Sequence, residues 1–119
     1  MFRLYSELNA LPPEDFLNPE NFVTGYDEQN PDYAEKQYRE GLRLSNEYDR
    51  ITICANGTWT ADIEGPHTYR WLTSTEGIGY HAHTASLLRG FLDGPAPVDV
   101  ARRQSDYSVK TTRIKEASK

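Results

Sequence analysis

The sequence predicts an α+β domain: two main helices packed on one face of a three-stranded antiparallel meander, with a further strand at the C-terminus. Three observations support this prediction. Residues 31–47 and 80–92 repeat apolar side chains at steps of three and four, whereas residues 51–63 alternate with a period of two. The 119 residues suit one domain, 1–119, and no internal repeat or boundary divides it.

The composition indicates a thin aliphatic core. Leu, Ile, Val and Phe together make up about 19% of the chain, near the level that accompanies disorder. Eight tyrosines and two tryptophans supply large side chains instead. We therefore expect a folded protein in which aromatic rings pad the core or an interface.

The N-terminal residues 1–29 are expected to be irregular with short helical turns, because Pro12 and Pro13 interrupt any helix begun before them. Asn18 and Asn30 are each followed by proline, which combines an N-cap residue with a proline at the first helical position. Asn18 thus predicts a short turn, and Asn30 predicts the start of the helix over 31–47.

A hairpin is predicted around Asn56-Gly57, between two alternating runs. A two-residue turn would pair Ile53 with Thr60, which sets an apolar side chain opposite a polar one. A three-residue loop pairs Ile53 with Trp59 and Ile51 with Ala61, so that the apolar side chains share one face. We therefore predict the three-residue loop, a type I turn whose bulge falls on Gly57.

The rest of the chain alternates strand and helix patterns. Residues 68–73 predict a third strand with Tyr69 and Trp71 on one face, one of them buried. A second helix follows over 80–92 and ends at Asp93-Gly94-Pro95. Residues 98–104 predict a turn of helix, and the alternation over 107–112 predicts the last strand, which frays into a tail over 115–119.

The charge is distributed unevenly. Residues 1–50 carry a net charge of −6 and residues 51–101 one of −3, whereas residues 102–119 carry +4. An acidic body repels phosphates, so we expect no nucleic-acid binding except through the basic tail 102–119. We favour the interpretation that residues 102–119 form a solvated tail.

No segment predicts a membrane helix or a signal peptide, because apolar runs are short and an acid interrupts the N-terminal one. Cys54 is the single cysteine, which excludes an intrachain disulfide. A strand cysteine without a neighbouring base is also expected to act as a small apolar residue rather than as a nucleophile. We expect a soluble, cytoplasmic protein.

The three histidines, His67, His81 and His83, are the candidate metal ligands. On a strand, His81 and His83 would point the same way, but at the start of a helix positions i and i+2 diverge. No carboxylate stands at a spacing that would complete a ligand set on that element. We therefore expect neither a metal nor another cofactor.

A glycine-containing loop, Ser74 to Gly79, lies between a predicted strand and a predicted helix. In outline Gly77-Ile78-Gly79 resembles the pyrophosphate loop of the acyl-CoA N-acyltransferase family, in which two residues separate an Arg or Gln from the Gly-x-Gly that follows. Ser74 stands where that basic or amide residue would be. The resemblance implies binding of an acyl-CoA-like anion. The alternative, which we favour, is a structural loop whose glycines relieve backbone strain before the start of a helix, with Thr73 and Glu76 as a capping box.

No catalytic constellation is recognisable by spacing, and the tyrosines exceed what one helix layer and one sheet need. The predicted function is a non-enzymatic protein-binding accessory protein that self-associates as a homodimer or binds another protein. By association with other small proteins, we expect it to be encoded on a phage or mobile element. The alternative is a small-molecule binding domain or enzyme with a pocket at the 74–81 loop, lined by Trp71, Glu76, Gly77, Gly79 and His81.

Overall fold

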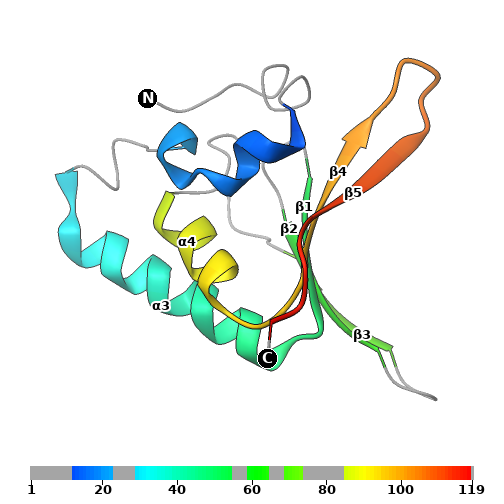
Figure 1. The fold of residues 1–119 in the computed structure, drawn as a ribbon. Coiled ribbons are helices and arrows are strands. Elements are labelled where there is room, and N and C mark those ends of the chain that lie inside the picture. Colours follow the sequence, from blue (N-terminus) through cyan, green and yellow to red (C-terminus); the bar gives the residue numbers. More distant parts are fainter. Residues whose placement is uncertain (1–11, 23–28, 55–58, 65–68, 74–84, 119) are drawn as a thin grey trace.

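The computed structural model describes residues 12–22, 29–54, 59–64, 69–73 and 85–118 of the chain. Within these ranges the chain forms two 3-10 helices, two α-helices and five strands (Figure 1). In chain order they are η1 (Pro13–Leu17), η2 (Pro19–Phe22), α3 (Pro31–Glu47), β1 (Arg50–Cys54), β2 (Trp59–Glu64), β3 (Tyr69–Thr73), α4 (Ala85–Asp93), β4 (Val98–Arg103) and β5 (Val109–Lys115).

The strands form one mixed sheet in the order β3-β2-β1-β4-β5. The pairs β1–β2 and β2–β3 are antiparallel, which confirms the predicted meander. The rest of the predicted sheet is wrong. Instead of one C-terminal strand there are two, and β4 lies parallel to β1 and pairs antiparallel with β5. A connection that passes through a helix, here α4, can return the chain in the parallel direction. The fold is therefore α+β, with two packed helices and a mixed sheet.

Residues 98–103 form a strand, so the predicted turn of helix is wrong there. Val98 and Val100 alternate with Asp99 and are fully buried in the core, which is the pattern of a strand with one face on the core. The last strand is also shifted from its predicted position over 107–112, because β5 begins at Val109 and Tyr107 belongs to the preceding turn.

The register of β1 and β2 is the one that was predicted from a three-residue loop. Ile51 stands opposite Ala61 and Ile53 opposite Trp59, and all four side chains are buried on the same face. Residues 55–58, and with them the predicted turn type, lie outside the described residues. On the next strand Trp71 stands opposite Asp62 in the register. The side chains of β3 are not described, so the burial of Tyr69 or Trp71 stays a prediction.

Both asparagine–proline pairs begin helical structure as predicted. The side-chain Oδ1 of Asn30 accepts a hydrogen bond of 3.1 Å from the amide of Tyr33, and α3 spans the predicted residues. The Oδ1 of Asn18 accepts one of 3.2 Å from the amide of Glu20 at the start of η2. The predicted helix over 80–92 corresponds to α4, and residues 80–84 lie outside the described part.

The two α-helices pack against each other through glycines. A Cβ atom on Gly90 would lie 2.3 Å from the carbonyl oxygen of Tyr38, and one on Gly41 would lie 2.3 Å from that of Leu87. No larger residue fits either position without moving the backbone. Near this contact the Tyr38 hydroxyl donates a 2.7 Å hydrogen bond to Asp93, which raises the pKa of Tyr38.

Helices and sheet meet in one core, and all the described helices lie on the same face of the sheet (Figure 1). Aromatic rings do pad this core, since Trp59 packs edge-on against Phe91 with ring centroids 5.6 Å apart. The core residues are Phe16, Leu44, Ile51, Ile53, Trp59, Ala61, Leu87, Leu88, Phe91, Ala96, Val98 and Val100. Among the described helices none combines the length and apolar character that crossing a bilayer requires.

Candidate functional site

Most of the predicted ligand and metal residues lie outside the part of the chain that the structure describes. They are Glu76, Gly77, Gly79, His67, His81 and His83. Trp71 has its backbone in β3, and its side chain is not described. The anion-binding loop therefore stays the alternative that the sequence left open, and the absence of a metal stays a prediction. Within the described ranges, no group of three or more His, Cys, Asp or Glu residues could hold a metal ion.

The β4–β5 hairpin carries two of the three large apolar side chains that are exposed among the described residues. Tyr107 is 84% exposed and Val109 is 62% exposed, and both lie on this hairpin. The third exposed large apolar residue, Leu17 at 48%, belongs to η1, which contacts β5. Figure 1 shows the hairpin extending away from the two α-helices. An exposed apolar cluster on a projecting element is typical of an interaction surface.

The turn of this hairpin is closed by two backbone hydrogen bonds. The amide of Tyr107 donates to the carbonyl of Gln104 at 3.0 Å, and the amide of Gln104 donates to the carbonyl of Ser108 at 2.8 Å. This is a β-turn followed by one residue in the left-handed region, the arrangement common in three-residue hairpin loops. The loop therefore has a defined geometry although it lies in solvent.

Asp106 fixes the same loop with its side chain. Its Oδ1 accepts hydrogen bonds from the amide of Ser108 at 3.1 Å and from the Ser108 hydroxyl at 2.5 Å. These bonds stabilise the carboxylate, first through the hydroxyl and then through the amide, and so lower the pKa of Asp106. The turn is thus held in shape by its own side chains.

Tyr107 occupies a strained backbone conformation. Its φ of 69° lies in the left-handed region, and no other described non-glycine residue has a positive φ. Glycine adopts this region freely, whereas an L side chain there costs about 1–2 kcal/mol. The strain coincides with a large ring that contributes little to the core, since the side chain is mostly exposed.

Basic side chains accompany the apolar ones on the hairpin. Arg103 and Lys110 are exposed, and Lys110 stands directly opposite Arg102 in the register. The predicted solvated tail over 102–119 is therefore wrong for residues 102–115, whose charges lie on two paired strands and their turn. Further on, the amide of Ser118 donates to the carbonyl of Pro95 at 3.0 Å.

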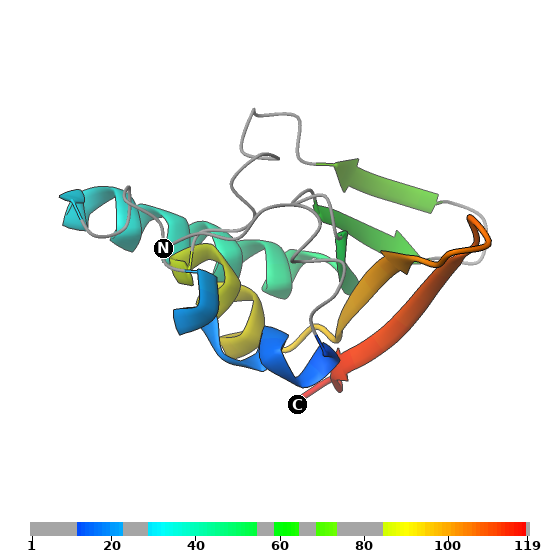
Figure 2. The ribbon, with the colours of Figure 1, turned by 90° about the horizontal axis from the view of Figure 1, so that it is seen from above.

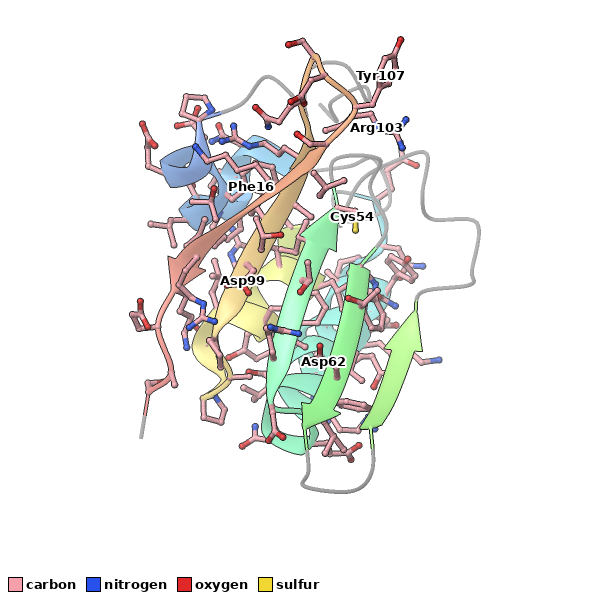
Figure 3. The ribbon with its side chains drawn as sticks, turned by 90° about the vertical axis from the view of Figure 1, so that its right-hand side faces the viewer. Phe16, Cys54, Asp62, Asp99, Arg103 and Tyr107 are labelled. Carbon is pink, nitrogen blue, oxygen red and sulfur yellow. The ribbon has the colours of Figure 1, made fainter. Side chains whose placement is uncertain are left out.

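The sheet face opposite the helices carries two cross-strand ion pairs (Figure 3). Arg50 on β1 donates to Asp62 on β2 at 2.6 Å, and Arg113 on β5 donates to Asp99 on β4. The two aspartates are only 4% and 5% exposed, so each charge is compensated where water is scarce. The contact with Asp99 is the main cause that raises the pKa of Arg113. These pairs join neighbouring strands, and Lys110 is a further exposed base of β5.

Sequence reasoning missed Tyr107 as a site residue because it placed this residue in a strand. The alternation of Tyr107, Val109 and Thr111 has the period of a strand. The turn is set instead by the side chain of Asp106, whose position two residues before Ser108 fits an Asx-turn. The polar run from Gln104 to Asp106 was the local indication of that turn.

Comparisons with known proteins give no match: no protein-family model fits this chain, and neither a curated protein nor a solved structure resembles it beyond chance. Function must therefore be argued from the site itself.

Proposed function

We propose that this chain is a non-enzymatic protein-binding module that self-associates, and that the β4–β5 hairpin is its binding element. The observation that carries the proposal is Tyr107, which combines a strained backbone with a side chain that is 84% exposed. Strained conformations persist where the surrounding structure imposes them, and they cluster at functional sites. Glycine at this position would fold more easily, so the ring is best explained by a contact with a partner.

The composition and rigidity of the hairpin support this function. Tyrosine and arginine are enriched in protein interfaces, and both occur here beside the exposed Val109. The hydrogen bonds of Asp106 hold the turn in one shape, which lowers the entropy lost on binding.

Charge complementarity supports binding to a protein rather than to nucleic acid. Residues 1–101 carry a net charge of −9, which repels phosphates, while residues 102–119 carry +4. A basic hairpin on an acidic body favours association with acidic protein surfaces.

Exchange of Tyr107 for glycine tests the proposal, because it should raise stability and weaken association at once. We expect Y107G to increase the free energy of unfolding of the monomer by about 1 kcal/mol, measured in urea at low protein concentration. In light scattering coupled to gel filtration, we expect wild type to show a dimer mass and Y107G to shift toward the monomer. Ser105→Ala, in the same turn, is the matched control and should leave both quantities unchanged.

A wild-type protein that remains monomeric at high concentration would contradict the self-association. A Y107G variant that is more stable and yet dimerises as wild type does would show that the ring is not the binding element.

A further inference from the structure

We propose that two copies of this chain pair through β5, antiparallel and edge to edge about Thr111, so that the two sheets become one continuous sheet. This inference rests on the proposed function, since it specifies how the self-association occurs. The partner is a second copy, and the contact is made by backbone hydrogen bonds together with the exposed apolar side chains.

The backbone of β5 is suited to accept another strand. Among the described residues, β5 is an edge strand that pairs with β4 alone (Figure 2). The bond from the amide of Gln104 to the carbonyl of Ser108 fixes the alternation of the ladder. Residues 110 and 112 therefore bond inward to β4, and Val109, Thr111 and Arg113 direct their N–H and C=O groups outward. The one irregularity of the ladder lies at Val98/Asp99, beyond this segment.

The sequence of β5 is self-complementary when the two-fold axis passes through Thr111. Thr111 then faces Thr111 of the second copy, Val109 faces Arg113, and Lys110 faces Thr112. No charged side chain stands directly opposite another of the same sign. An axis at Lys110 would place two lysines opposite each other, which destabilises a strand pair. The axis at Thr111 also uses the outward groups of all three residues, so it makes the most hydrogen bonds.

The bases of β5 do not prevent this pairing. Lysine on an edge strand commonly guards against association. Here Arg113 is already paired with Asp99, and its Nη1 lies 3.4 Å from Glu116, so its charge is compensated. Lys115 donates to the carbonyl of Ala96 at 3.2 Å, and burial lowers its pKa. Lys110 remains, and the register places it opposite a threonine.

The pairing also covers exposed apolar side chains of the hairpin. In an antiparallel arrangement about Thr111, the tip of one hairpin lies beside the C-terminal half of the other β5. Tyr107 and Val109 of one copy thus approach that end of the second β5, and Val109 lies on the sheet face opposite the helices, where Arg113 pairs with Asp99. Figure 2 shows η1 next to that end of β5. The contact therefore shields Val109 of each copy on the sheet face opposite the helices, whereas Leu17 lies on the helix side of the sheet and takes no part in it.

A proline at position 111 tests the pairing. Because the amide of Thr111 points away from β4, proline should be tolerated in the monomer, as it is on edge strands. It removes the central outward donor of both copies, and we expect the dimer dissociation constant to rise by about tenfold or more. Thr111→Val keeps the amide and the strand propensity, so it is the matched control and should dimerise. Circular dichroism verifies that T111P remains folded.

A cysteine at the same position provides a second test that does not depend on weakening the dimer. In a Cys54→Ser background, T111C should form a disulfide-linked dimer on mild oxidation, because residues facing each other in such a pair lie about 5.5 Å apart at Cα. K110C in the same background faces Thr112 of the second copy and should cross-link far more slowly.

The outcomes separate the two proposals. A dimer that is unaffected by T111P, with no preference for the T111C cross-link, would overturn the β5 pairing and leave self-association standing. A monomer at the highest concentration, with T111C and K110C equally slow to cross-link, would overturn both proposals and leave β5 as an edge for a strand of another protein.

Discussion

At the α3–α4 contact two helix backbones touch, whereas at the tip of the β4–β5 hairpin a tyrosine ring stands in solvent. A side chain on Gly90 would meet backbone atoms of Tyr38, Gly41 and Leu42 within 3 Å. At the hairpin, Tyr107 keeps its large side chain in a backbone conformation that glycine would adopt more easily. At Gly90 the local sterics require the smallest residue. At Tyr107 they favour glycine, and the chain carries a large side chain instead.

The difference shows which part of the molecule is shaped by folding and which part is not. In the helix layer the smallest residue is the one that allows close packing, and the buried Leu87, Leu88 and Phe91 depend on it. At the hairpin tip the larger residue adds strain and little burial. Stability explains the glycines, and it does not explain the tyrosine.

The strongest test of the helix contact is Gly90→Ala. Its Cβ would lie 2.3 Å from the carbonyl oxygen of Tyr38 and 2.6 Å from the amide of Leu42, and backbone atoms cannot move aside cheaply. We expect a loss of about 3 kcal/mol of unfolding free energy, measured by urea denaturation. The neighbouring exposed residue gives the control, since Arg89→Ala should cost under about 1 kcal/mol. A G90A protein as stable as wild type would mean that the helices do not approach this closely.

A smaller effect is expected at Ser45, which joins α3 to the segment before β4. Its buried hydroxyl accepts a 3.0 Å hydrogen bond from the amide of Ala96. Ser45→Ala removes this acceptor, and we expect a loss of about 1–3 kcal/mol, measured as a lower denaturation midpoint. Ser118→Ala, which alters an exposed hydroxyl, should change stability by less than about 0.5 kcal/mol. Equal effects of the two substitutions would contradict the role of the Ser45 bond.

The sequence predicts correctly those elements that depend on local spacing. The bounds of α3 follow from Asn30-Pro31 and a period of 3.6, and the β1–β2 register follows from matching Ile53 to Trp59. The parallel pairing of β1 with β4 is different, because it joins residues that are nearly fifty positions apart, such as Ile51 and Val98. The alternation of apolar and polar residues in β4 is too short to identify that strand. It consists of two valines, and Ala101 and two arginines follow them.

The hairpin that we propose as the binding element was predictable only in part. The excess of tyrosines and the change of charge after residue 101 pointed to an interface. They did not show which tyrosine is exposed, because that depends on a turn that competes with the strand pattern. The side-chain bonds of Asp106 decide this competition, since they end the alternation at Ser108 and place Tyr107 at the tip.

The smallest effect that we predict concerns pH and the shape of this tip. Because the bonds from Ser108 lower the pKa of Asp106 in the folded state, they contribute stability that is fully present above the unfolded value of 3.8 and is lost as pH falls through the folded pKa. The turn should therefore keep its shape at neutral pH and loosen only under more strongly acid conditions, with little change in the rest of the fold. The amide shift of Ser108 in an NMR titration would report this, with a midpoint below 3.8. Asp106→Asn should abolish that titration. A midpoint at or above the unfolded value would show that the turn is not held by this carboxylate, and the strain at Tyr107 would then need another cause.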